Sequence, residues 1–291
     1  MNFVIKNDYY TATFSDRGAE LVSLRHANGK ELLWIPRPEK FWNYTAAFVF
    51  PICATLLDDA YYYGGKRYEM KIHGIIKDTL FKVVHHDDTK IVFNVLLSRP
   101  DVYPFENSFT AEYELLDDKL LVKVTIKNLD DKVMPYMFGW HPGFVLHSDE
   151  GQNIEDYVLY FDNCEKVTRT PLQNTYFARS YGEDYPLVNS AYRLCEEEIY
   201  KNDTMMFSDC KNSITLAADG HPFRLDMTWS ENLPYFCVWK TPIHEENFIC
   251  LEAWTGTQND GEHEENFETR KMEHLAPGEA VTYNYTLKIS F

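Results

Sequence analysis

Apolar and polar residues alternate with a period of two in many stretches of the sequence, and this pattern limits the folds that the chain can adopt. A period of two places every second side chain on one face of an extended strand, so it indicates half-buried β-strands. The runs end at turn signals such as Asn28-Gly29, Gly64-Gly65 and Asp117-Asp118, and pairs of this kind favour hairpins. The C-terminal run EAVTYNYTLKISF alternates almost to its last residue, which predicts that the terminus pairs within a sheet.

Helical periodicity is scarce by comparison. Only residues 193–203 and part of 36–46 favour a short helix. Hydrophobic residues make up 45% of the chain, enough to bury a large core, and the many tyrosines and phenylalanines favour strands. No low-complexity linker divides the sequence. We therefore predict an all-β protein, in which residues 1–291 form a single large antiparallel β-sandwich domain of about 15 or more strands with few short helices.

Charge and motifs exclude several classes of protein. The formal net charge of -17 argues against a nucleic-acid partner and against an acidic membrane surface. None of the six cysteines forms a CxxC pair, and the GxSxG and HExxH motifs are absent. The first 14 residues do not read as a signal peptide, and no segment is apolar for long enough to cross a bilayer. We predict a cytoplasmic protein with reduced cysteines and no bound metal, as a monomer or homodimer.

Two histidines stand at places where a strand ends or turns. In MKIHGIIKDTLF (70–81), His73 precedes Gly74, so the backbone can turn while the imidazole projects into a cavity. In KVMPYMFGWHPGF, Pro142 restricts His141 to extended geometry. An imidazole held in this way suits proton transfer near neutral pH. For either histidine taken alone, a structural role remains the more common explanation.

Glu252 is the carboxylate that most favours a functional interpretation. It lies within the apolar run FICLEAW, where burying a charge is costly unless the group is paired or used. Trp254 shares its face by alternation, and we predict that this indole contacts a sugar. The two HEEN segments, 244–247 and 263–266, lack metal-ligand spacing and are interpreted as solvated loops.

Taken together, these stretches resemble the aldose 1-epimerase (galactose mutarotase) family, closest to its LacX-like branch. The resemblance implies a galactose mutarotase-like β-sandwich and an activity that interconverts the α and β anomers of a free hexose without metal or cofactor. The matching segments follow the family's order: FVFPICATL (48–56), YYYGGKRYEMKIHGIIKD (61–78), GWHPGF (139–144), YFCVWKTP (235–242), ICLEAW (249–254) and LAPGEAVTYNYTLKI (275–289).

The resemblance also implies roles for individual residues. Glu252 matches the general base that acts on the anomeric hydroxyl, and His141 matches the histidine that protonates the ring oxygen, with the two groups on opposite sides of the hemiacetal. His73 matches a second histidine that binds and polarises the sugar. Asp203 is the candidate for an aspartate that holds sugar hydroxyls. Lys77 stands where the LacX-like pattern has an arginine.

Departures from the family pattern leave other functions open. Thr55 stands where the family usually has an arginine, and Lys77 lacks the planar bidentate geometry of that residue. A sugar-binding or sensing protein with little turnover is therefore the alternative. A hexose-6-phosphate epimerase would need a cationic pocket, for which only Lys66, Arg67 and Lys77 are near. A glycoside hydrolase would need two flanking carboxylates, of which the sequence identifies one.

Overall fold

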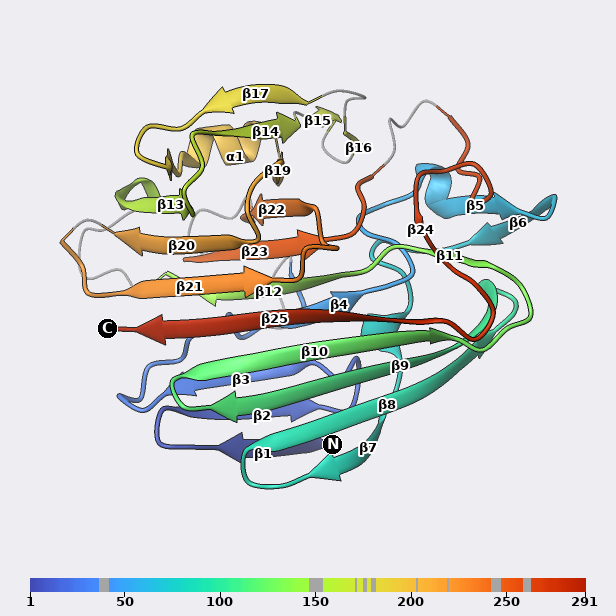
Figure 1. The fold of residues 1–291 in the computed structure, drawn as a ribbon, viewed down its shortest axis with the longest axis horizontal. Helices are drawn as coiled ribbons and strands as arrows, with labels where there is room; N and C mark the ends of the chain where they lie inside the picture. Colours follow the sequence, from blue (N-terminus) through green and yellow to red (C-terminus); the bar gives the residue numbers. More distant parts are fainter. Residues whose placement is uncertain are drawn as a thin grey trace.

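The computed structural model confirms the predicted antiparallel β-sandwich (Figure 1). It describes residues 1–36, 42–146, 154–170, 172–174, 177–178, 182–202, 204–218, 220–241, 247–258 and 263–291. Two large sheets dominate the described chain. None of its helices is long and apolar enough to cross a membrane.

The larger sheet has nine described strands in the spatial order β18-β13-β20-β21-β25-β10-β9-β8-β7. In that order the strands are Ala191–Arg193, Tyr157–Phe161, Ser213–Ala218, Arg224–Trp229, Ala280–Ser290, Lys119–Asn128, Tyr103–Leu116, Lys90–Arg99 and Lys82–His86. The C-terminal strand β25 lies in the middle of this sheet, between β21 and β10, which confirms the prediction that the C-terminal run pairs within a sheet.

The second large sheet has seven described strands in the order β17-β14-β19-β22-β23-β12-β4. In that order the strands are Glu183–Pro186, Lys166–Thr170, Thr204–Ser208, Tyr235–Trp239, Phe248–Trp254, Gly139–Val145 and Ala46–Val49. Strands that lie between residues 46 and 254 of the sequence thus meet in one sheet.

Smaller sheets and short helices complete the described fold. A three-stranded sheet holds β1, β2 and β3, and two-stranded sheets pair β11 with β24, β15 with β16 and β5 with β6. The strands are Asn2–Lys6, Tyr10–Ser15, Leu21–His26, Met134–Tyr136, Glu273–Leu275, Leu172–Asn174, Phe177–Ala178, Ala60–Tyr63 and Lys66–Glu69. The helices are α1 at Glu196–Asn202 and 3-10 turns at Leu57–Asp59, Ile76–Asp78 and Ile154–Asp156.

Local sequence signals account for several of these elements. The predicted hairpins form at Gly64-Gly65, between β5 and β6, and at Asp117-Asp118, between β9 and β10. Both glycines have positive φ, a conformation that glycine adopts without strain. The helix predicted within 193–203 is α1. The helix considered within 36–46 does not form in residues 42–46, and residues 37–41 lie outside the described chain.

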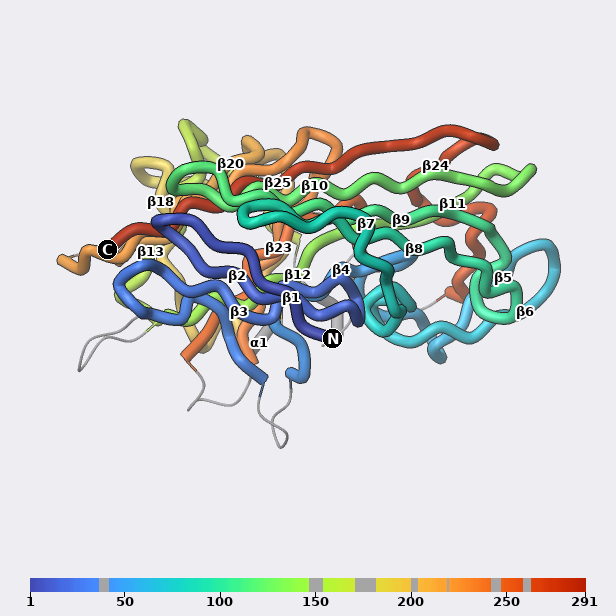
Figure 2. The backbone as a smooth tube through the Cα atoms, turned by 90° about the horizontal axis from the view of Figure 1, so that it is seen from below, coloured from blue at the N-terminus to red at the C-terminus, as the bar shows by residue number. Residues whose placement is uncertain are grey.

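The two large sheets pack face to face through aromatic side chains. Phe48 of β4 contacts Phe109 of β9 with ring centroids 5.7 Å apart, and Trp140 of β12 contacts Tyr285 of β25 at 5.3 Å. Figure 2 shows β10 and β25 in one layer with β4 and β12 beneath them. Because side chains alternate along a strand, His141, next to the inward Trp140, faces away from the nine-stranded sheet.

Candidate active site

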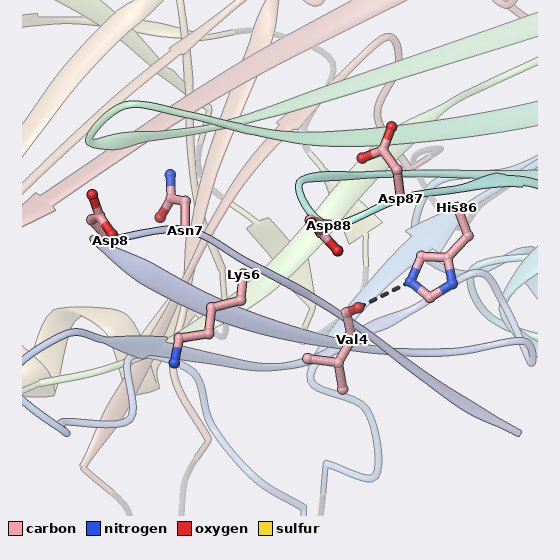
Figure 3. A pocket seen from close by; sticks show the side chains of 7 residues that line it. All are labelled: Val4, Lys6, Asn7, Asp8, His86, Asp87 and Asp88. Carbon is pink, nitrogen blue, oxygen red and sulfur yellow. Dashed lines mark hydrogen bonds between the residues drawn. The ribbon is translucent and has the colours of Figure 1, made fainter.

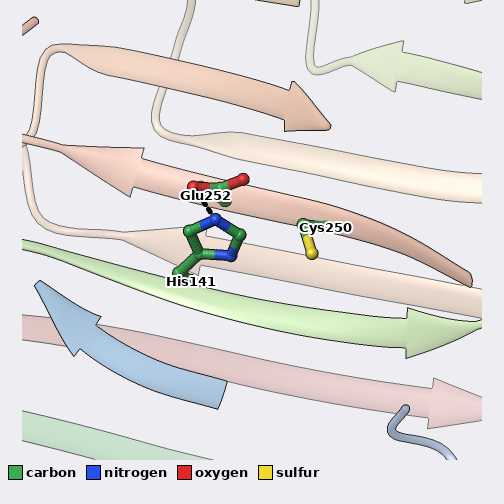
Figure 4. A group of neighbouring side chains, drawn as sticks. All are labelled: His141, Cys250 and Glu252. Atoms are coloured by element: carbon green, nitrogen blue, oxygen red, sulfur yellow. Dashed lines mark ion pairs between the residues drawn. The ribbon is translucent and has the colours of Figure 1, made fainter. Parts of the chain in front are cut away.

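Neighbouring strands of the seven-stranded sheet bring the predicted acid and base together. Strands β12 and β23 pair with Gly139 opposite Trp254, and the same antiparallel register sets His141 opposite Glu252. The Nε2 atom of His141 is 3.3 Å from Oε2 of Glu252, and Figure 4 shows the two groups side by side. The side chains are almost fully buried, with 5% and 1% of their surface exposed. The pair is thus adjacent rather than divided by the cavity.

A cavity of about 290 Å³ lies over this pair. Its size is at the small end of the usual range for sites that take small molecules, about 300–1,000 Å³. Besides the pair, its wall includes Trp42, Thr55, His73, Trp239, Trp254 and Gln258. Of the residues predicted to bind sugar, His73 and Trp254 therefore share the cavity with His141 and Glu252.

His73 is held in the cavity wall by a tight turn. Its φ is +63° and that of Gly74 is +69°. A Cβ on residue 74 would lie 2.2 Å from the carbonyl oxygen of Phe50, so only glycine fits there. The backbone N–H of Ala54 donates to Nδ1 of His73 at 3.2 Å. Because Nδ1 accepts this bond, the neutral imidazole carries its proton on Nε2.

Burial controls the charge of both histidines. It lowers the pKa of His141 to about 3, from an ordinary value of 6.5. Burial also lowers the pKa of His73 well below its usual range, and the positive charge of Lys77, together with that of His141 when it is protonated, lowers it further. Desolvation disfavours the charged imidazolium. Both imidazoles are therefore neutral at pH 7 in the sugar-free protein.

Tryptophans form the apolar part of the wall. Trp42 stacks on His141 with ring centroids 4.2 Å apart and an interplanar angle of 21°. The rings of Trp239 and Trp254 lie 5.9 and 6.3 Å from the same imidazole. Aromatic rings packed around a histidine exclude water and fix its orientation.

Several buried polar atoms in this wall have no hydrogen-bond partner among the described residues: Nδ1 of His141, Nε1 of Trp42, Nε1 of Trp254 and Oε1 of Gln258. A buried polar atom without a partner costs about 1–3 kcal/mol. Four such atoms around one cavity indicate a site for a polar ligand rather than an apolar one.

The structure places Lys77 elsewhere. Its Nζ donates to the carbonyl oxygens of Ile72 and Gly74, at 2.9 and 2.7 Å. It lies 3.6 Å from Asp78 and does not line the cavity formed by the described residues. Lys77 therefore supports the turn that carries His73. The other predicted sugar ligand, Asp203, lies outside the described residues.

One group of three ligand-type side chains in the described chain is close enough to share a metal ion. The ligand atoms of His141, Cys250 and Glu252 lie within 4.8 Å of one another (Figure 4). A metal binds thiolate rather than thiol, yet burial raises the pKa of Cys250. This thiol also packs in an apolar cluster with Trp34 and Phe248. The group fits a metal poorly.

A larger hollow of about 650 Å³ lies beside β1 and the turn between β7 and β8. Figure 3 shows its polar residues and His86, whose Nε2 is 2.9 Å from the carbonyl oxygen of Val4. Its histidine and aspartates are exposed, so water screens their charges. The smaller cavity, with its buried pair, is the better candidate for an active site.

Trp42, Trp239 and Gln258 are wall residues that the sequence did not identify. Trp239 pairs with Cys250 in the register of β22 and β23, so a correct strand alignment would have placed it near Glu252. Gln258 follows β23 by four residues, and the polar stretch TGTQND was its only signal. Trp42 had no local signal.

The protein is a two-sheet β-sandwich with a buried carboxylate–imidazole pair at the base of a small cavity. These features are typical of a galactose mutarotase-like fold. The family model for aldose 1-epimerase matches residues 1–288. The chain belongs to the aldose 1-epimerase family.

Individual relatives agree with this assignment. The plasmid-encoded protein LacX of Lactococcus lactis subsp. lactis is 27% identical over 273 residues, covering 88% of both chains. A galactose mutarotase related enzyme from Lactobacillus acidophilus aligns with a TM-score of 0.90 at 26% identity, covering 99% of this chain and 97% of its own. A galactose mutarotase-like protein from Lactobacillus casei has the same fold, with a TM-score of 0.90 at 24% identity and coverage of 99% and 100%.

Proposed function

We propose that this protein is an aldose 1-epimerase, which interconverts the α and β anomers of a free hexose through general acid–base ring opening. The observation that carries the proposal is the 3.3 Å approach of His141 Nε2 to Glu252 Oε2 at the base of a cavity of about 290 Å³. The anomeric hydroxyl and the ring oxygen of a pyranose are bonded to the same carbon atom. Two adjacent groups, one accepting and one donating a proton, can therefore serve both atoms.

The proposed reaction moves two protons in each direction. The Glu252 carboxylate takes the proton of the C1 hydroxyl, the C1–O5 bond breaks, and O5 takes a proton from His141. This gives the open-chain aldehyde. Rotation about C1–C2 presents the other face of the carbonyl, which O5 attacks. His141 recovers the O5 proton, and Glu252 returns its proton to the carbonyl oxygen, so the net change is inversion at C1.

The starting protonation state follows from burial. Burial favours the neutral, protonated form of a carboxyl group, and the imidazole of His141 is neutral at pH 7. We infer that the pair holds one proton, which passes from Oε2 to Nε2 when a sugar binds. The transfer yields the carboxylate and imidazolium that ring opening requires, and the proton belongs to the pair rather than to either residue.

His73 and the tryptophans complete the proposed site. The Nε2–H of His73 is available as a donor, because Nδ1 already accepts from Ala54. A neutral donor stabilises developing charge on a sugar oxygen without the cost of burying a second cation. Trp254 offers its indole N–H and an apolar face to the C–H groups of the ring.

Polarimetry tests the proposal. Freshly dissolved α-glucose and α-galactose should relax faster with the protein than in buffer, in proportion to protein concentration. The matched control is His86→Asn, which removes an exposed imidazole at the other hollow and should keep full activity. No acceleration with either sugar would count against the enzyme. Binding without acceleration would support the sugar-binding alternative, which the loss of the family arginine at Thr55 favours.

A further inference from the structure

We propose that the side-chain amide of Gln258 binds one hydroxyl group of the sugar and thereby helps to set which aldose the site accepts. This inference rests on the proposed function. Gln258 is 6% exposed and lines the cavity that contains His141 and Glu252. Its Oε1 is buried and has no hydrogen-bond partner within the described residues. A buried carbonyl oxygen favours an O–H or N–H donor, and a sugar hydroxyl in the cavity would supply one.

The backbone around Gln258 is anchored from two sides. The N–H of Thr255 donates to the carbonyl of Phe138 at 2.8 Å, and the hydroxyl of Thr255 accepts from the N–H of Phe138 at 2.8 Å. Arg270 Nη2 donates to the carbonyl of Thr257 at 2.8 Å. A segment fixed in this way loses little conformational entropy when a ligand binds. Most of the free energy of a hydrogen bond to Gln258 therefore contributes to affinity.

A buried ion pair holds Arg270 in position for its hydrogen bond to the carbonyl of Thr257. The Arg270 guanidinium pairs with Glu265, and their side chains are 7% and 0% exposed. Water therefore screens this pair little. Arg270 and Glu265 act here as positioning residues, because they hold the peptide that precedes Gln258 and line a neighbouring hollow instead of the cavity over His141.

The hydrogen-bonding chemistry of the wall gives Gln258 a distinct role. The indole nitrogens of Trp42 and Trp254, which have no partner in the described part of the chain, can only donate. The amide oxygen of Gln258 can only accept. Donors tolerate a ligand oxygen of any kind, but this acceptor needs a hydroxyl proton at one position. A sugar that lacks or inverts that hydroxyl leaves a buried oxygen unsatisfied, which discriminates more strongly than a lost contact alone.

Binding of non-reacting sugars tests the inference apart from turnover. The probes are 1,5-anhydroglucitol and 1,5-anhydrogalactitol, which lack an anomeric hydroxyl, and their 2-, 3-, 4- and 6-deoxy analogues. Intrinsic fluorescence reports binding, because three tryptophans line the cavity. The variant is Gln258→Leu, which keeps the side-chain size without the hydrogen bond. Asn94→Leu is the matched control, since it removes a carboxamide that bonds Ser108 and Thr110 in the nine-stranded sheet.

We expect Gln258→Leu to bind the parent compound about tenfold more weakly than wild type, while Asn94→Leu binds it unchanged. One deoxy analogue should bind wild type and Gln258→Leu equally, and this identifies the hydroxyl that Gln258 accepts. The inference is overturned if Gln258→Leu weakens the binding of every deoxy analogue by the same factor. It is also overturned if this variant binds the parent compound as tightly as wild type does. Urea unfolding confirms that each variant is folded, and Gln258→Ala replaces Gln258→Leu if it is not. Wild type that shows this pattern without accelerating mutarotation overturns only the proposed function.

Discussion

Burial of His141 predicts a specific loss of stability in acid. Its pKa is about 3 in the folded protein, against 6.5 for an ordinary histidine. As the pH falls, the unfolded state therefore takes up a proton before the folded state does. The free energy of unfolding consequently rises with pH between about pH 3 and pH 6.5. The contribution is complete above pH 6.5 and is lost progressively as the pH falls toward 3. At pH 5 the loss is about 2 kcal/mol, since each pH unit below 6.5 contributes about 1.4 kcal/mol.

Urea unfolding of wild type and His141→Asn at pH 7 and pH 5 measures this term. The asparagine does not titrate. From pH 7 to pH 5, the free energy of unfolding of the variant should therefore fall by about 2 kcal/mol less than that of wild type. The comparison between pH values cancels any loss that is independent of pH. His274→Asn is the control, because this histidine of β24 is exposed. If wild type and His141→Asn lose the same amount, the imidazole is not held neutral by burial, and the proton assignment to the pair is wrong.

Further predictions concern the turn that carries His73 and the pH range of activity. Gly74→Ala should destabilise the fold by at least about 3 kcal/mol, because its Cβ would overlap the Phe50 carbonyl. Gly64 has the same sign of φ but open space around it. In thermal unfolding, the control Gly64→Ala should therefore be less stable than wild type by only about 1 kcal/mol. Lys77→Met should destabilise by about 2 kcal/mol and raise KM, because two carbonyls lose their donor; an unchanged melting temperature would contradict this role. Epimerase activity should persist to pH 5, since the pair takes a second proton only near pH 3, whereas an acid limb at pH 6.5 would indicate an ordinary histidine.

The fold was predictable because its main signal is local. Alternation along β9, β10 and β25 sets which side chains face the core, and turn residues such as those at 64–65 set where hairpins close. Strand order is harder to predict, because it depends on which strands pair and pack together when they are far apart in the sequence. The placing of β4 beside β12 could be expected only through the family resemblance.

The candidate site was predictable where a single residue carried the signal. Glu252 stood out as a carboxylate in an apolar run, and alternation put Trp254 on its face. The direct contact between Glu252 and His141 was not predictable, because it depends on the register between β12 and β23. Lys77 illustrates the opposite limit. Its sequence position suggested a ligand, but its side chain turns back toward its own loop.

The central claim is that Glu252 and His141 exchange protons with the sugar, and mutarotation by Glu252→Gln is its most direct test. The amide keeps the size of the carboxylate but cannot take the proton of the C1 hydroxyl. We predict that the rate at saturating α-glucose falls by about 10²–10⁴-fold, while the variant still binds 1,5-anhydroglucitol. Wild-type rates in Glu252→Gln would contradict the assignment.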